Sequence, residues 1–284
     1  MIPSGFEYHR PSDLPAAVKI LDEHGDEARV LAGGHSIIPM MKLRMADLSH
    51  LIDLQDVASL KEVSVSGDTI TIGAMVTQAE LIGNEALVKA APILREAALQ
   101  IADPQVRYVG TIGGNVANGD PGNDMPGLMQ CLDATYVLYG SDGEREVDAR
   151  EFYEAAYMTA RADNEILTHI KIKATTAGYA YEKQKRKIGD YATAAAAVLI
   201  EQSGGKVTSA SIAMTNLSDT PIHSVGAGDA LVGTACDAAA INAAIAAMQA
   251  DIQPNEDNRG PIEFKRHVAA TMLRRAIERA WSRA

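Results

Sequence analysis

Two diglycine turns constrain this chain more than any other feature of its sequence. The first is Ala32-Gly33-Gly34-His35-Ser36, and the second, about eighty residues later, is Thr111-Ile112-Gly113-Gly114-Asn115. Glycine has no Cβ and tolerates positive φ, so paired glycines allow backbone N–H groups to approach an anion closely. One such turn is common in proteins, whereas two of the same kind favour a pyrophosphate group that is held from both sides.

A polar segment rich in turn-forming residues follows the second turn, from Val116 to Pro126. It is longer and more specialised than a connector between two elements requires. Within it, Asp120 and Asp124 have the spacing of an acid pair, but no base or nucleophile accompanies them. We therefore expect this segment to belong to a binding site, and we expect no catalytic side chain in it.

The composition excludes several classes of function. The chain has 284 residues and a net charge of −11, whereas nucleic-acid binders usually present a basic face. Its two cysteines, Cys131 and Cys236, are too few for a disulfide framework or a four-cysteine iron–sulfur cluster. Residues 1–30 show no signal-peptide pattern, and the longest apolar run, 192–200, is too short to cross a membrane. We therefore expect a cytoplasmic protein in a reducing compartment.

The pattern of apolar and turn-forming residues predicts a chain that mixes helices and strands. Near the N-terminus it predicts a β-α-β unit, preceded by a helix that Ser12 or Asp13 caps and Gly25 ends. Further along, it predicts a hairpin at 62–73, a helix capped by Thr77, one long helix over 87–101, and strands over 134–140 and 165–173. Beyond a composition shift at 175–178, it predicts strands over 179–185, 192–201 and 206–214 and a final helix over about 262–283. The expected domains are 1–176, divided at about 57/58, and 177–284.

The familiar dinucleotide signatures are missing from this sequence. The string nearest to a Rossmann fingerprint, 226–231, does not lie between a convincing strand and helix, and no Walker A pattern occurs. If a dinucleotide binds, a different scaffold must hold it.

Several strings resemble the FAD-binding medium subunits of molybdenum hydroxylases, the xanthine dehydrogenase family. These are the two diglycine turns with 41–44 and 101–107 beside them, the loop 118–126, and the stretch 181–193. The resemblance covers essentially the whole chain, and the stretch 181–193 points to the carbon monoxide branch. It implies an α+β fold: a two-part FAD-binding domain of the PCMH/vanillyl-alcohol-oxidase type, followed by a smaller C-terminal domain with a three-stranded antiparallel sheet and helices.

The resemblance also implies which residues bind a non-covalent FAD. Both turns wrap the diphosphate, Asp124 lies on the nucleotide side, and the main chain near Ile166 and Leu167 approaches the isoalloxazine. A lysine of the next strand does so too, either Lys183 or Lys185, with a preference for Lys185. The expected FAD-binding residues are Ala32, Gly33, Gly34, His35, Ser36, Thr111, Ile112, Gly113, Gly114, Asn115, Asp124, Ile166, Leu167, Lys185 and Tyr191. The other six histidines lack the spacing of a metal site, so no metal ligand is expected.

By the same resemblance, the chain is an electron-transfer subunit that is inactive on CO alone. A small subunit with [2Fe-2S] clusters and a large subunit with a molybdenum–copper cofactor are its expected partners, in a dimer of heterotrimers that oxidises CO to CO2. A quinone or cytochrome is the expected acceptor, and peripheral association with the inner face of the membrane is an option. The alternatives are a medium subunit for an N-heterocycle or aldehyde substrate, a stand-alone flavin oxidase, and a non-enzymatic nucleotide-binding scaffold.

Overall fold

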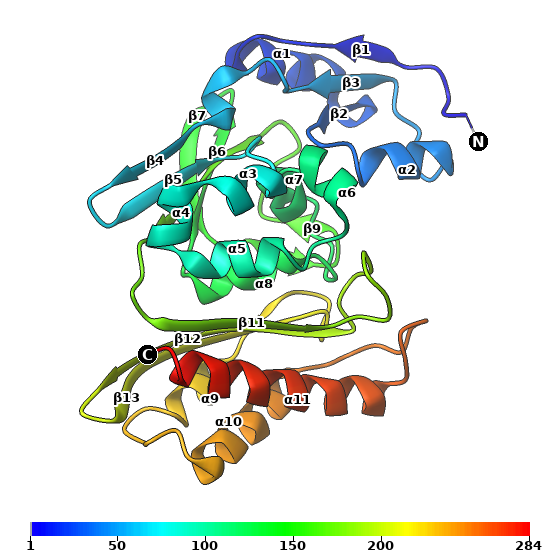
Figure 1. Ribbon diagram of the computed structural model, residues 1–284. Helices are drawn as coiled ribbons and strands as arrows, with labels where there is room; N and C mark the ends of the chain where they lie inside the picture. Colours follow the sequence, from blue (N-terminus) through cyan, green and yellow to red (C-terminus); the bar gives the residue numbers. More distant parts are fainter. Residues whose placement is uncertain (1) are drawn as a thin grey trace.

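The computed structural model describes residues 2–284 and shows three units along the chain, each built around one sheet (Figure 1). The first unit is a parallel sheet of β1 (Glu7–His9), β3 (His50–Asp53) and β2 (Ala28–Leu31), in that order. Helix α1 (Leu14–His24) begins where the Asp13 carboxylate accepts a hydrogen bond from the Ala16 N–H. Helix α2 (Ile37–Lys42) connects β2 to β3, so the predicted β-α-β unit is confirmed.

The second unit is an antiparallel five-stranded sheet covered by short helices. Its strand order is β4 (Val63–Ser66), β5 (Thr69–Gly73), β10 (Ile166–Lys173), β6 (Thr135–Gly140) and β7 (Gly143–Asp148). The helices are α3 (Gln78–Gly83), α4 (Glu85–Ala90), α5 (Pro92–Ala98), α6 (Pro104–Val109), α7 (Ile112–Ala117) and α8 (Asp124–Cys131). A small hairpin of β8 (Tyr153–Ala155) and β9 (Met158–Thr159) completes the unit.

The prediction of one long helix over 87–101 is wrong. The chain forms α4 and α5 instead, and Ala91 between them is not helical. Pro92 explains the break, because a proline lacks the N–H that a helix interior needs and fits at the first helical position. Four strands of the first two units, β1, β7, β8 and β9, were not predicted at all.

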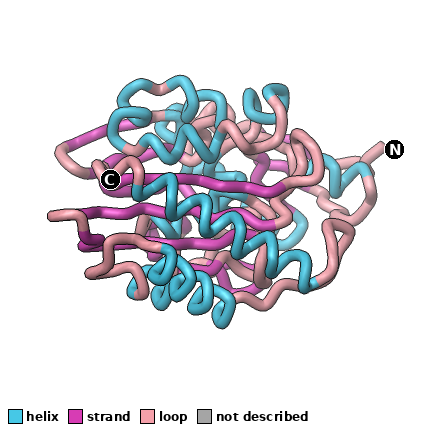
Figure 2. Tube along the Cα trace, turned by 60° about the horizontal axis from the view of Figure 1, so that its bottom comes forward, coloured by secondary structure: helices cyan, strands magenta, loops and turns pink. Residues whose placement is uncertain are grey.

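The third unit is an antiparallel sheet of β11 (Gly178–Gln184), β12 (Ala194–Ser203), β13 (Lys206–Thr215) and the short β14 (Ile222–His223). The three predicted strands are confirmed, and β14 adds a two-residue fourth strand at the edge. Helices α9 (Val225–Asp229), α10 (Ala238–Asp251) and α11 (Ile262–Trp281) lie on one face, which is turned forward in Figure 2. No helix among residues 2–284 is long and apolar enough to cross a membrane.

Strand β12 is buried on both faces. Ala195 and Ala197 belong to a core shared with α5 and α8 of the second unit, whereas Ala196 and Val198 face the core under α10 and α11. Because alternate residues of a strand point to opposite faces, a strand covered on both sides requires a continuous apolar run. This arrangement explains the apolar stretch 192–200 and fixes the third unit against the second.

Candidate functional site: a cavity between the three units

A cavity of about 780 Å³ lies where the three units meet. This volume falls within the range of about 300–1,000 Å³ that is common for small-molecule sites. Of the residues that the sequence predicts to bind FAD, all line this cavity except Ile112 and Lys185. Segments that are far apart in the sequence therefore come together as the resemblance implies.

The first diglycine turn presents backbone N–H groups that have no carbonyl partner in the described part of the chain. Among residues 2–284, no carbonyl accepts a hydrogen bond from the N–H of Gly33, Gly34, His35 or Ser36. The turn closes through the Ile38 N–H, which donates to the Gly34 carbonyl at 3.1 Å, and Gly34 has a φ of +72°. Consecutive N–H groups of this kind form a concavity that binds anions.

Gly33 is required by close packing within the protein. A Cβ at this position would lie 2.4 Å from the Val109 carbonyl oxygen and 2.7 Å from the Gly110 Cα. The first turn therefore rests directly on the chain between α6 and α7, at the entrance to the second diglycine turn. A side chain on Gly33 would separate the two turns.

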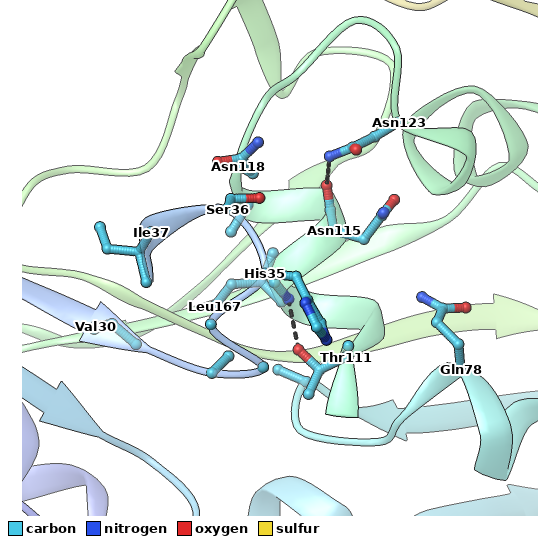
Figure 3. Close-up of a pocket in the computed structure, with 18 of the residues that line it drawn as sticks. Val30, His35, Ser36, Ile37, Gln78, Thr111, Asn115, Asn118, Asn123 and Leu167 are labelled. Atoms are coloured by element: carbon cyan, nitrogen blue, oxygen red, sulfur yellow. Dashed lines mark hydrogen bonds between the residues drawn. The ribbon is translucent and has the colours of Figure 1, made fainter. Parts of the chain in front are cut away.

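The second diglycine turn uses its N–H groups inside the protein. The Gly113 N–H donates to the Ala74 carbonyl at 2.9 Å, and the Gly114 N–H donates to the Thr111 hydroxyl at 3.0 Å. The Asn115 N–H donates to the Thr111 carbonyl, so the turn forms the capped start of α7. Its contribution to the cavity is therefore a wall of small residues and the side chains beside it (Figure 3).

Gln78 is a candidate ligand-binding residue that the sequence did not predict. Its side chain lines the cavity, is 2 % exposed, and neither of its amide atoms has a partner among residues 2–284. Its own N–H donates to the Gly110 carbonyl, which places Gln78 beside the second turn, as Figure 3 shows. A buried polar group without a partner costs about 1–3 kcal/mol, so a polar ligand atom is expected to meet this amide. No sequence signal distinguishes it from any other residue in the first turn of a helix.

Asp124 lies at the start of α8 in a buried ion pair. One carboxylate oxygen accepts a hydrogen bond from the Tyr181 hydroxyl at 2.6 Å, and the other lies 2.8 Å from the Lys183 Nζ. Burial raises the pKa of the Tyr181 hydroxyl well above its ordinary value, and the Asp124 charge raises it further. Tyr181 therefore stays a neutral donor, and Asp124 and Lys183 form a fixed pair of charges in the cavity wall.

The two candidate lysines occupy different places. Lys183 lines the cavity and has only 1 % of its side chain exposed. Lys185 donates to the carbonyl and the side-chain oxygen of Gln100, outside the residues that line the cavity. Burial lowers the pKa of Lys185, and the neighbouring charge of Lys183 lowers it further.

The start of β10 and Tyr191 complete the wall. Strand β5 pairs with β10 only from His169 onward, so Ile166 and Leu167 have a sheet neighbour only on the β6 side. Both residues line the cavity, and the resemblance implies that the main chain here approaches the flavin ring. Tyr191 lies in the loop between β11 and β12, 42 % exposed, with the Arg259 guanidinium 5.5 Å from its ring centre.

This set of groups fits a flavin dinucleotide. The unpartnered N–H groups of the first turn suit a diphosphate, the orphaned Gln78 amide suits a polar ring edge or hydroxyl, and Ile166, Leu167 and Tyr191 offer apolar and aromatic surface. Acid–base catalysis has no comparable support here, because Asp124 is engaged by two protein donors.

Comparison with known proteins places the chain in a family. Residues 4–175 match the FAD binding domain in molybdopterin dehydrogenase, and residues 179–280 match the CO dehydrogenase flavoprotein C-terminal domain. The chain is 54 % identical to the carbon monoxide dehydrogenase medium chain of Afipia carboxidovorans, over 100 % of this chain and 99 % of that one. It is 44 % identical to the medium chain from Hydrogenophaga pseudoflava, with the same coverage.

The structural comparison gives the same result. A crystal structure of a cyanide-inactivated Cu,Mo-CO dehydrogenase contains a chain that superposes with a TM-score of 0.98 at 55 % identity, and each chain is covered completely. The predicted fold class is therefore confirmed, and so is the prediction that this chain carries an FAD-binding domain. The chain belongs to the FAD-binding medium subunits of the molybdopterin dehydrogenase family, and it is a subunit of an oxidoreductase.

Proposed function

We propose that this chain is the medium subunit of a carbon monoxide dehydrogenase and carries electrons from a partner subunit to an external acceptor. The observation that carries the proposal is the full-length identity of 54 % and 44 % to two carbon monoxide dehydrogenase medium chains. The overall reaction converts CO and water to CO2, two protons and two electrons. It takes place on a large subunit with a molybdenum–copper cofactor, so this chain alone is inactive on CO.

Bound FAD would supply the redox chemistry between the electron donor, a [2Fe-2S] cluster of the small subunit, and the acceptor, a quinone or cytochrome. The residues of this chain bind and orient it. The N–H groups of 33–36 bind the diphosphate, and the Gln78 amide meets a polar atom of the cofactor. Of the two lysines we propose Lys183 as the cavity residue, because it lines the cavity and Lys185 does not.

The assembly we propose is a dimer of heterotrimers with a large molybdenum subunit and a small iron–sulfur subunit, placed at the inner face of the membrane by its acceptor. We also propose domains 1–176, divided at about 57/58, and 177–284. Three separate apolar clusters support this division: one centred on α1 and the first sheet, one in the second unit, and one under α10 and α11. The second cluster also takes in residues of the third sheet, so the two domains share an interface.

Anaerobic reduction of the purified complex by CO tests the proposal. CO is expected to bleach the flavin absorbance, and metal analysis is expected to find molybdenum and copper in the co-purifying subunits. A complex carrying Gly33→Val, depleted of flavin, is the matched control: CO should still reduce its iron–sulfur clusters, but electron delivery to a quinone should stop. A flavin that stays oxidised while CO is present would overturn the assignment.

The same anaerobic measurement of flavin absorbance distinguishes the alternative functions. Bleaching by an N-heterocycle or an aldehyde, without bleaching by CO, would assign the complex to another substrate. Flavin reduction by a substrate in the isolated chain would indicate a stand-alone oxidase, and a purified chain without redox-active flavin would indicate a scaffold.

A further inference from the structure

Three histidines from different elements meet at the edge of the first sheet. His9 ends β1, His24 ends α1, and His50 begins β3. One ring nitrogen from each lies within 4.8 Å of the others, and the His9 Nε2 is 2.9 Å from the His50 Nδ1. The rings of His24 and His50 stack with their centres 3.6 Å apart. Although their spacing in the sequence does not indicate a metal site, the fold brings them together.

The surroundings of this cluster favour a cation. The Glu7 carboxylate lies 3.7 Å from the His50 Nδ1 and is largely exposed, so it is free to turn toward the rings. His24 is the last residue of an 11-residue helix, whose C-terminal carbonyls carry partial negative charge. The acidic residues Asp22, Glu23 and Asp26 are exposed next to it in the chain.

The spacing of these groups is close to that of a zinc site. Zinc takes four ligands in a tetrahedron at about 2.0–2.1 Å, so two ligand atoms of one site lie roughly 3.4 Å apart. The His50 Nδ1 lies 2.9 Å from the His9 Nε2 and 3.7 Å from the Glu7 carboxylate, one distance below this value and one above it. Coordination also requires the rings of His24 and His50, now stacked with their centres 3.6 Å apart, to turn out of the stack, and all three rings are only partly buried.

We propose that His9, His24 and His50 bind one Zn²⁺ ion, with the Glu7 carboxylate as fourth ligand. The ion would join β1, α1 and β3 at one point. Strand β2, which leads directly into the first diglycine turn, pairs with β3 at Ala28 and His50. The zinc site therefore stabilises the unit that presents this turn, and none of its four residues lines the flavin cavity.

Zinc titration of the isolated full-length chain tests the proposal. The chain is stripped of metal with a chelator, and Zn²⁺ is titrated against a chromophoric chelator that competes for it. We expect one tight equivalent in the wild-type chain. Loss of an outer-shell partner typically weakens a metal site by about 10- to 100-fold, so His24→Gln, which removes a ligand, should weaken binding by at least about 100-fold. His267→Gln, at an exposed histidine of α11, should leave the affinity unchanged.

Co²⁺ provides an independent readout. In the wild-type chain it should give the intense visible bands of a four-coordinate ion, and Glu7→Gln should alter these bands while three nitrogen ligands remain. Flavin content of each variant, measured in parallel, shows whether the chain has folded. A wild-type chain that binds no Zn²⁺ more tightly than His24→Gln does would overturn the proposal and leave the three rings as a stack with one hydrogen bond.

Discussion

The two diglycine turns look equivalent in the sequence but perform different tasks in the structure. In the first, four consecutive N–H groups from Gly33 to Ser36 have no carbonyl partner among residues 2–284. In the second, the N–H groups of Ile112, Gly113, Gly114 and Asn115 are all bound within the protein. The first turn is therefore available to an anion, and the second is a structural support on which the first turn rests.

The glycines are needed for different reasons in the two turns. At Gly113 a Cβ would lie 2.4 Å from the Ala74 Cβ and 2.6 Å from the Ala74 carbonyl oxygen, inside the core. At Gly33 it would meet the backbone of Val109 and Gly110 at the contact between the turns. Gly33 and Gly113 are thus both required by packing, and only the N–H groups distinguish the two turns, which is why paired glycines alone are weak evidence for a phosphate site.

The largest effect is expected from Gly113→Val, which should destabilise the whole fold. Overpacked core positions cost about 1–3 kcal/mol, and this site, with three contacts under 3 Å, belongs at the upper end. For a chain of this size the corresponding fall in Tm is roughly 6–12 °C, with loss of FAD as a consequence. Thermal unfolding of the apo chain measures it. Gly114→Val is the matched control, because its Cβ would meet mainly the Thr111 hydroxyl; equal destabilisation by both would contradict the structural role of Gly113.

Next in size is Gly33→Val, which should act on the flavin more than on the fold. The substitution pushes the first turn away from Gly110 and misaligns its N–H groups. Loss of two hydrogen bonds to a charged group, at about 1.5–3 kcal/mol each, would weaken FAD binding by about 100-fold or more. The flavin-to-protein ratio after gel filtration reports this loss. Gly83→Val, where a Cβ meets no atom within 4 Å, is the control, and normal flavin content in Gly33→Val would refute the proposed role of the first turn.

The smallest effect is expected from Gln78→Leu, which tests whether a side chain beside the second turn contributes to FAD binding. The apo chain should be as stable as the wild type or more so, because the buried amide loses no protein partner. FAD should bind about tenfold more weakly, which corresponds to one hydrogen bond. Flavin titration measures the FAD affinity, and the Tm of the apo chain measures its stability. The control is Gln130→Leu, at a buried glutamine outside the cavity whose side chain donates to the Ala149 carbonyl; an unchanged FAD affinity in Gln78→Leu would show that the amide does not meet the cofactor.

Local signals made much of the fold predictable. Asp13 caps α1 as expected, Thr77 and Glu80 form a reciprocal capping box, and the hairpin at Ser203-Gly204-Gly205 has positive φ at both glycines. Strand β7 escaped prediction because its residues, GEREVD, are polar and mostly exposed, so no apolar alternation marks them. The proline at 92 is a sequence signal for the break between α4 and α5, but the apolar residues on both sides keep helical spacing and so predict one continuous helix.

The cavity was predictable as a set of motifs, whereas the roles of its members were not. Whether the N–H of Gly113 is free depends on Ala74, and whether that of Ile112 is free depends on Val76, both distant in sequence. Gln78 is an ordinary residue until its burial and its lack of a partner are seen. Lys183, in β11, and Lys185, just after it, both donate to the Gln100 carbonyl, and only their other partners distinguish them: Asp124 for Lys183 and the side chain of Gln100 for Lys185.

The double burial of β12 has a consequence for how the chain is made. The apolar core of the second unit includes Tyr181, Ala195, Ala197 and Ala213 from the third sheet. These residues are synthesised after the two diglycine turns and after every strand of the second sheet. The core that packs under the second turn is therefore complete only when the chain has been synthesised beyond residue 213. A nascent chain that stops near 176 exposes the apolar faces of α5 and α8. Flavin loading is thus expected to be a post-translational event that follows synthesis of nearly the whole subunit.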